Sequence, residues 1–119
     1  MSLLVNAYTR GPDGSMMIIE SEDHSQELAG FESYRQTLYG SRAARALGLQ
    51  LLPTLDGSDL YAEGDDIQRL YAEAELALAN IKSFEAETGA TSDSLRARFE
   101  NIIAAARQAS AVGGGVVIW

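Results

Sequence analysis

The chain's single histidine, His24, is the residue best suited to chemistry. Glu22 and Asp23 precede it and Ser25 follows it. A histidine beside carboxylates can act as a general base, and with a serine it could form a hydrolytic triad. The chain lacks the G-x-S-x-G pattern that holds a nucleophilic serine on a sharp turn. A solvated loop histidine is the simpler interpretation, so we expect no catalytic residue and no cofactor.

A second stretch, "DGSDLYAEGDD" at residues 56–66, has the acidic composition of a calcium loop. Counted from Asp56, however, Tyr61 occupies the sixth position, where an EF-hand needs glycine, and Ile67 occupies the twelfth, where it needs glutamate. The chain has no cysteine, which excludes disulfides and thiolate metal sites. The stretch therefore predicts a solvated acidic loop, and we expect no metal site.

Carboxylates gather in two runs that contain no lysine or arginine. The members are Glu20, Glu22, Asp23 and Glu27 in the first run and Asp56, Asp59, Glu63, Asp65 and Asp66 in the second. Solubility alone explains any single run. Two runs in one half of the chain favour a docking face, because clustered carboxylates steer a basic partner and speed its encounter. Tyr61, inside the second run, could supply an aromatic anchor.

Length and charge narrow the function further. The chain has 119 residues and a net charge of −8, and we expect residues 1–119 to form a single domain. Residues 1–66 hold eleven acids and four bases, whereas residues 67–119 hold six and five. Such an acidic chain is repelled by nucleic-acid backbones, so nucleic acid is not an expected partner. With no leader and no run of about 18 apolar residues, we expect a soluble, cytoplasmic protein that binds no membrane.

The two ends of the chain predict strands. Residues 3–8 and 16–20 flank a Gly-Pro-Asp-Gly turn and indicate a β-hairpin. The four consecutive apolar residues at 16–19 are typical of a strand covered on both faces or near the sheet centre. At the other end, "GGGVVIW" predicts that Gly113 ends a helix and that residues 116–119 return to the sheet beside a hairpin strand.

The middle of the chain predicts helices. Apolar residues recur at helical spacing over 67–84, with Asp65 as the expected N-cap. A second long helix is expected from about Asp93, and a shorter helix over 31–48 is broken at Gly40. Residues 20–29 are expected to form a loop or an irregular helix start.

These elements predict an α+β fold. A small sheet formed by the N-terminal hairpin and the C-terminal strand packs against two long helices and a shorter broken helix. The layout, with "SLLVNAYTR" at the start, an acidic middle and "RFENIIAAARQA" leading into "GGGVVIW", resembles bacterial polymorphic-toxin immunity proteins. These small cytoplasmic antidotes bind and block a cognate toxin by occlusion, so the resemblance implies no catalytic residue. Many of their toxins are nucleases with basic sites, which an acidic inhibitor could occupy in place of phosphates.

These features leave three candidate functions. The first is a stoichiometric inhibitor of a basic toxin, which binds through the acidic runs. The second is a non-catalytic structural or adaptor subunit of a cytoplasmic protein complex. The third is a small enzyme that uses His24 and its neighbouring carboxylates.

Overall fold

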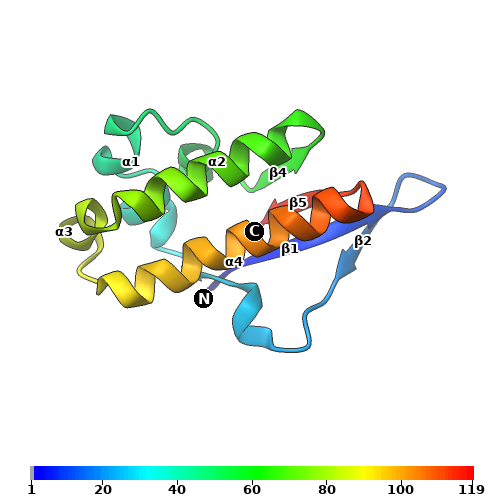
Figure 1. Cartoon of the computed structure of the whole chain (residues 1–119), viewed down its shortest axis with the longest axis horizontal. Coiled ribbons are helices and arrows are strands. Elements are labelled where there is room, and N and C mark those ends of the chain that lie inside the picture. Colours follow the sequence, from blue (N-terminus) through cyan, green and yellow to red (C-terminus); the bar gives the residue numbers. More distant parts are fainter. Residues whose placement is uncertain (1) are drawn as a thin grey trace.

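The sheet joins the two ends of the chain. The computed structural model describes residues 2–119, and within them the sheet has five antiparallel strands. These are β1 (Ser2–Arg10), β2 (Met16–Ile19), β3 (Leu28–Phe31), β4 (Leu60–Glu63) and β5 (Gly115–Ile118). Their order is β2-β1-β5-β4, and β3 pairs with the first residues of β1. The predicted hairpin and the predicted C-terminal strand beside it are both confirmed (Figure 1).

Two long helices cover one face of this sheet. Helix α2 (Asp65–Ala79) packs beside α4 (Ser92–Val112), and α4 also contacts β1, β3 and β5 (Figure 1). The predicted broken helix is a π-helical turn at Arg35–Tyr39 followed by α1 (Arg42–Ala46). Short helix α3 (Glu85–Thr88) and 3-10 turns at His24–Glu27, Leu52–Asp56 and Ile81–Phe84 complete the chain. No helix within residues 2–119 is long and apolar enough to cross a bilayer.

The core lies between the helices and the sheet. Val5, Ile118 and Leu60 lie side by side across β1, β5 and β4, and all three are buried. Successive side chains of a strand point to opposite faces, so every second residue of these strands faces the helices. The helices contribute apolar residues at helical spacing, among them Phe99 and Ile102 of α4. The predicted α+β architecture is confirmed.

Two glycines let the chain pass from α4 directly into β5. Gly113 adopts the left-handed conformation, with φ of 65°, and ends the helix as predicted. Gly114 donates a backbone hydrogen bond to the carbonyl of Ala109, 2.9 Å away. A Cβ atom on Gly114 would lie only 1.8 Å from the carbonyl oxygen of Tyr8. The glycine therefore allows β5 to enter the sheet immediately beside β1.

Two strands occupy stretches where the sequence predicted none. Strand β4 lies inside the predicted acidic loop, and β3 occupies the predicted loop and the start of the broken helix. Phe31 consequently ends β3 and is 59% exposed, instead of lying on a helical stripe. Each strand has only four residues, too few for alternation to stand out from loop composition. Pairing with β5 and β1, which are distant in sequence, makes them strands.

Three finer predictions are also wrong. Strand β2 is an edge strand, not a central one, because it pairs with β1 alone. Gly64, not Asp65, is the N-cap of α2, and Asp65 is the first helical residue, where its charge still favours the helix dipole. Helix α2 ends at Ala79, and the apolar stripe continues to Phe84 through a 3-10 turn.

Replacing Gly114 with alanine should destabilise the protein by about 1–3 kcal/mol, because the new methyl group meets the rigid carbonyl of Tyr8. Chemical denaturation of the purified chain measures this change. Gly113→Asn is the control, since asparagine tolerates the left-handed conformation, and it should cost less than about 1 kcal/mol. Equal costs for the two variants would contradict the close approach of β5 to β1.

Candidate functional site

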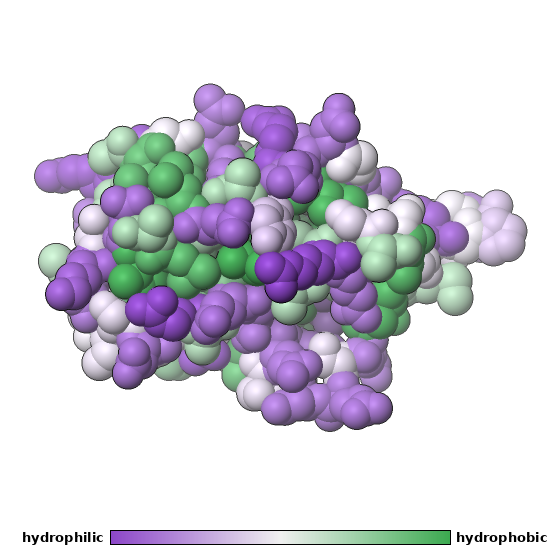
Figure 2. Space-filling model, in the orientation of Figure 1, coloured by the Kyte–Doolittle hydropathy of each residue, from purple (hydrophilic) through white to green (hydrophobic). Residues whose placement is uncertain are grey.

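The face of the sheet turned away from α2 and α4, here called the outer face, is the setting of the candidate site. Register places these residues on it: Leu4, Asn6, Tyr8, Arg10, Met16, Ile18, Tyr61, Glu63, Gly115, Val117 and Trp119. Figure 2 shows the opposite side of the molecule, formed by the helices, where hydrophobic patches lie among hydrophilic side chains. Both long helices pack against the other face of the sheet, so neither of them covers the outer face.

Two large aromatic side chains stand exposed on the outer face. Tyr61 of β4 is 53% exposed and Trp119, which follows β5, is 39% exposed. Val117 of β5 is the direct cross-strand partner of Tyr61, and both Val117 and Tyr8 are fully buried. Exposed aromatic rings over buried apolar side chains are typical of protein interfaces, where tyrosine and tryptophan supply much of the binding energy.

A chain of hydrogen bonds fixes the tryptophan ring. The indole Nε1 of Trp119 donates to Asn6 Oδ1 at 3.1 Å, and Asn6 Nδ2 donates to Glu27 Oε2 at 3.0 Å. The same carboxylate oxygen accepts the backbone N–H of Ser21 at 2.9 Å, and Oε1 lies 3.0 Å from Nδ1 of His24. Asn6 and Glu27 have little exposed surface, so these bonds satisfy polar groups that water reaches only from the side of the adjoining hollow.

Glu27 is held in its ionised form. The backbone N–H of Ser21 lowers the pKa of this carboxyl, and hydrogen bonds from His24 and Asn6 act in the same direction. Burial acts in the opposite direction but does not prevail. The site therefore contains a buried negative charge whose position is set by three segments of the chain.

A hollow of about 500 Å³ opens beside this network. Trp119, Leu4 and Ile18 form its apolar wall. Its polar lining is Asn6, Glu20, Ser21, Glu22, His24 and Glu27. Three carboxylates thus line the hollow, and no lysine or arginine lies among its lining residues. The hollow is suited to a positively charged group with an apolar stem.

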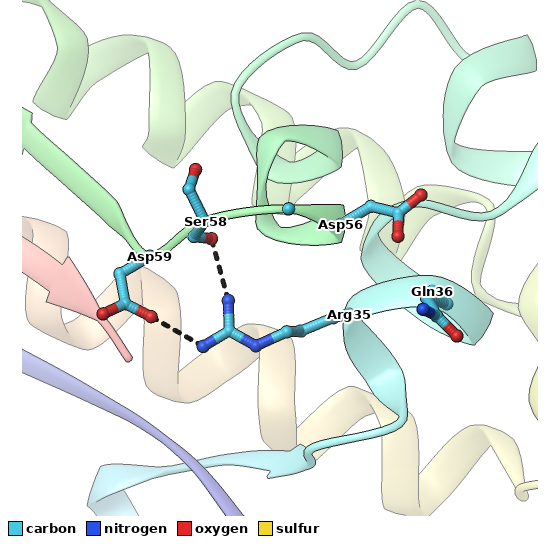
Figure 3. Close-up of a pocket in the computed structure, with 6 residues that line it drawn as sticks. Arg35, Gln36, Asp56, Ser58 and Asp59 are labelled. Carbon is cyan, nitrogen blue, oxygen red and sulfur yellow. Dashed lines mark hydrogen bonds and ion pairs between the residues drawn. The ribbon is translucent and has the colours of Figure 1, made fainter.

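The second acidic run is arranged differently, because four of its five acids pair with arginines. Arg35, whose side chain is 18% exposed, reaches from its π-helical turn to the loop before β4 (Figure 3). Its guanidinium donates to Asp59 at 2.6 Å and to the carbonyl oxygens of Ser58 and Leu55 at 2.8 and 3.1 Å. This arrangement fixes the loop. The same guanidinium also contacts Glu32 at 2.5 Å, so Asp59 shares its positive charge with a second carboxylate.

Glu63 is also paired with an arginine from another strand. It accepts hydrogen bonds from Arg10, at 2.7 Å, and from the hydroxyl of Tyr8. These two donors lower the pKa of Glu63. The pKa of Tyr8 is raised to about 12, mainly by burial of the hydroxyl and then by its hydrogen bond to Glu63. The other ion pairs of the run are Asp56 with Arg45 at 3.6 Å and Asp66 with Arg69 at 2.9 Å. Within residues 2–119, Asp65 alone in this run lacks an ion pair.

The predicted binding residues therefore divide into groups. Glu20 and Glu22 line the hollow and are exposed, and Asp23 is exposed nearby, where it caps the 3-10 turn. Glu27 belongs to the same run but is buried and structural. In the second run only Tyr61 and Glu63 lie on the outer face. The other four acids of that run flank β4 in the preceding loop and at the start of α2.

The structure gives His24 one partner and no nucleophile. Its Nδ1 contacts Glu27, but its side chain is 72% exposed. The hydroxyl of Ser25 donates to Asp23 at 2.7 Å, so the neighbouring serine is not directed at the histidine. Among residues 2–119, no group of three histidine or acidic side chains could hold a metal ion. The arrangement can orient a histidine, but it assembles no triad.

Asn6 and Trp119 were absent from the residues that the sequence singled out for binding. A signal was present for Asn6, because it is the one strongly polar residue inside the apolar stretch 3–8. Nothing in the sequence pairs it with Glu27, since strand pairing and the 3-10 turn bring the two together. Comparison of the chain with protein-family models, curated proteins and solved structures gives no match.

Replacing Glu27 with glutamine should cost about 1–2 kcal/mol of stability at pH 7 through the lost charge-assisted hydrogen bonds. Because the folded protein lowers the pKa of Glu27, its contribution is present above the unfolded pKa of about 4.3 and is lost as pH falls through the folded value. Unfolding free energies of wild type and Glu27→Gln should therefore approach each other as pH falls from about 4.3 through the lower pKa of the folded state. The exposed Glu22→Gln is the control and should change little at any pH. A Glu27→Gln deficit that is independent of pH would contradict a role for the charge.

Proposed function

We propose that this protein is a stoichiometric inhibitor of the immunity type, which binds and blocks a basic toxin enzyme through its outer face. One observation carries the proposal. The exposed ring of Trp119 borders a hollow whose charged lining consists of carboxylates with no lysine or arginine among them. Such a surface suits a partner whose own surface is basic.

The two kinds of side chain have different roles in this proposal. Glu20 and Glu22, which carry no ion pair within residues 2–119, attract a basic partner over several ångströms and speed its approach. The rings of Trp119 and Tyr61 then bury apolar area and slow its departure. Because Asn6 holds the indole in place, little side-chain freedom of Trp119 is lost on binding.

A nuclease is the toxin class that fits this surface best. Nuclease sites are basic because they bind phosphates, and the carboxylates around the hollow can occupy such a site in their place. Inhibition by occlusion requires a rigid, complementary surface and no catalysis. The fixed Trp119–Asn6–Glu27 network meets that requirement.

A structural or adaptor subunit of a cytoplasmic complex is the alternative. The same aromatic and acidic surface would serve it, and the two functions differ only in what the partner does. A toxin gene directly upstream of the gene for this chain would favour immunity. An operon of unrelated complex subunits would favour an adaptor.

Association kinetics with the neighbouring toxin domain test the proposal. Reversing Glu20 and Glu22 to lysine should lower the association rate about tenfold at low salt, because these charges act by steering. The wild-type rate should fall as salt rises and the screening length shortens to about 8 Å at physiological strength. Trp119→Ala should instead raise the dissociation rate, by tenfold or more.

The matched control reverses two acids far from the outer face. Glu87→Lys with Asp93→Lys makes the same change in net charge at α3 and the start of α4, at the opposite end of the molecule from β2 (Figure 1). It should alter the association rate by less than about threefold. Equal effects of the two double variants would mean that only net charge matters. Asp59 and Glu63 are poor test positions, because reversing them also breaks ion pairs with Arg35 and Arg10.

His24 should be dispensable under this proposal. His24→Ala removes one of the hydrogen-bond partners of Glu27, yet Asn6 and Ser21 still hold that carboxylate. We expect cells that express the toxin domain to be protected by His24→Ala as well as by wild type, and toxin affinity to change less than about fivefold. Loss of all protection with an unchanged melting temperature would instead support the enzyme.

A further inference from the structure

The hydrogen-bond pattern of the sheet leaves the outer edge of β2 unpaired. Leu4 and Trp119 exchange two backbone hydrogen bonds of 2.9 Å. Hydrogen-bonded and non-hydrogen-bonded pairs alternate along antiparallel strands. The backbone groups of the even-numbered residues of β1 therefore bond to β5, and those of its odd-numbered residues bond to β2. The N–H and C=O groups of Met16 and Ile18 consequently point away from β1. Within residues 2–119 they make no other hydrogen bond.

The other two edges of the sheet are protected. Side chains cap the carbonyls of β3, where Asn101 donates to Leu28 at 2.8 Å and Tyr39 donates to Ala29 at 2.6 Å. Strand β4 ends in the charged Glu63 and contacts α2. Charges, caps and covering helices are the usual means by which edge strands avoid pairing with other chains. Strand β2, Met-Met-Ile-Ile, contains no charged side chain, and no side-chain cap or helix within residues 2–119 covers its outer edge. Its protection is limited to its length of four residues and to Glu20, which follows it.

Position and charge indicate what β2 would bind. The strand lies at the rim of the molecule beyond both long helices, and its main contacts are with β1 (Figure 1). Met17 is 55% exposed. Residues 11–27, which contain β2, hold five acids and no lysine or arginine. At the end of the strand, Ile18 and Glu20 line the hollow.

We infer that β2 is the docking edge for an extended basic segment of the partner, which adds a strand to the sheet beside Met16 and Ile18. The inference rests on the proposed function and specifies how the partner binds. The two residues offer two N–H donors and two C=O acceptors, and main-chain pairing of this kind gives affinity without a deep pocket. A lysine or arginine near the end of the added strand reaches Glu20 and Glu22 in the hollow.

A second copy of this chain is the poorer occupant of the edge. Two copies would each bring a net charge of −8 and the same five acids of residues 11–27. These acids lie outside β2 itself, and they would repel the matching acids of a second copy across the shared edge. A segment that alternates apolar and basic side chains pairs with the same edge and gains from its charges.

The test uses the isotopically labelled full chain and a peptide of eight residues that alternates lysine and valine. On titration, we expect the backbone amide signals of Met16 and Ile18 to shift, to saturate and to exchange more slowly with solvent. The control peptide has the same sequence with every backbone nitrogen methylated, which keeps the charges and removes the N–H donors. It should bind at least about tenfold more weakly, which corresponds to 1.4 kcal/mol.

Two variants at one position isolate the backbone donor in the protein. Met16→Pro removes the outward N–H at the first residue of the strand, where proline is tolerated, and leaves the bonds to β1 intact. Met16→Ala loses the side chain but keeps the N–H. We expect Met16→Pro to bind the peptide at least about fivefold more weakly than Met16→Ala. If Met16→Pro does not fold, the comparison of the two peptides on the wild-type chain decides.

Several outcomes would overturn the inference. These are no binding of the peptide, equal binding of the methylated peptide, or shifts confined to the amides of Tyr61 and Glu63 on β4. Concentration-dependent dimerisation that protects the amides of β2 would identify a second copy as the occupant. Toxin protection by wild type is measured separately. Protection without pairing at β2 would contradict this inference alone. Pairing without protection would contradict the toxin-inhibitor proposal and leave β2 as the docking edge.

Discussion

The insertion of β5 between β1 and β4 is the contact on which the other features depend. Val116, Val117 and Ile118 are fully buried, and the backbone of β5 bonds to a strand on each side. Without β5, strand β4 has no partner within the sheet, and Tyr61 is no longer held on the outer face. Gly114 is the residue that makes this insertion sterically possible.

The same insertion creates the outer face and brings distant residues together there. Trp119 meets Asn6 only because β5 pairs with β1, and Asn6 reaches Glu27 only because the 3-10 turn lies against β1. A buried carboxylate with several hydrogen-bond donors is stable where an unpaired one would be costly. The polar network therefore stiffens one side of the hollow and also determines how the indole ring is presented.

The fold decides which carboxylates lie next to arginines, and the order of residues along the chain does not reveal this. The two acidic runs look alike along the chain, yet Arg10 and Arg35 lie far from the second run in sequence and meet it in space. The first run meets no arginine or lysine within residues 2–119, and it keeps its negative potential next to an exposed edge strand and an exposed tryptophan. Of the two runs, the first therefore keeps more unpaired negative charge.

The sequence by itself determined the α+β class, the hairpin, both long helices and the return of the last strand, because each depends on local periodicity and turn residues. It also placed Tyr61, Glu20, Glu22 and Asp23 at an exposed surface. Tertiary structure alone decided that β3 and β4 are strands, since four residues carry too little pattern and their hydrogen bonds come from distant segments. It likewise decided which carboxylates are free, which are paired and which, like Glu27, are buried. Ion pairs and burial depend on distances in space, and those distances are set by the pairing of strands far apart in the chain.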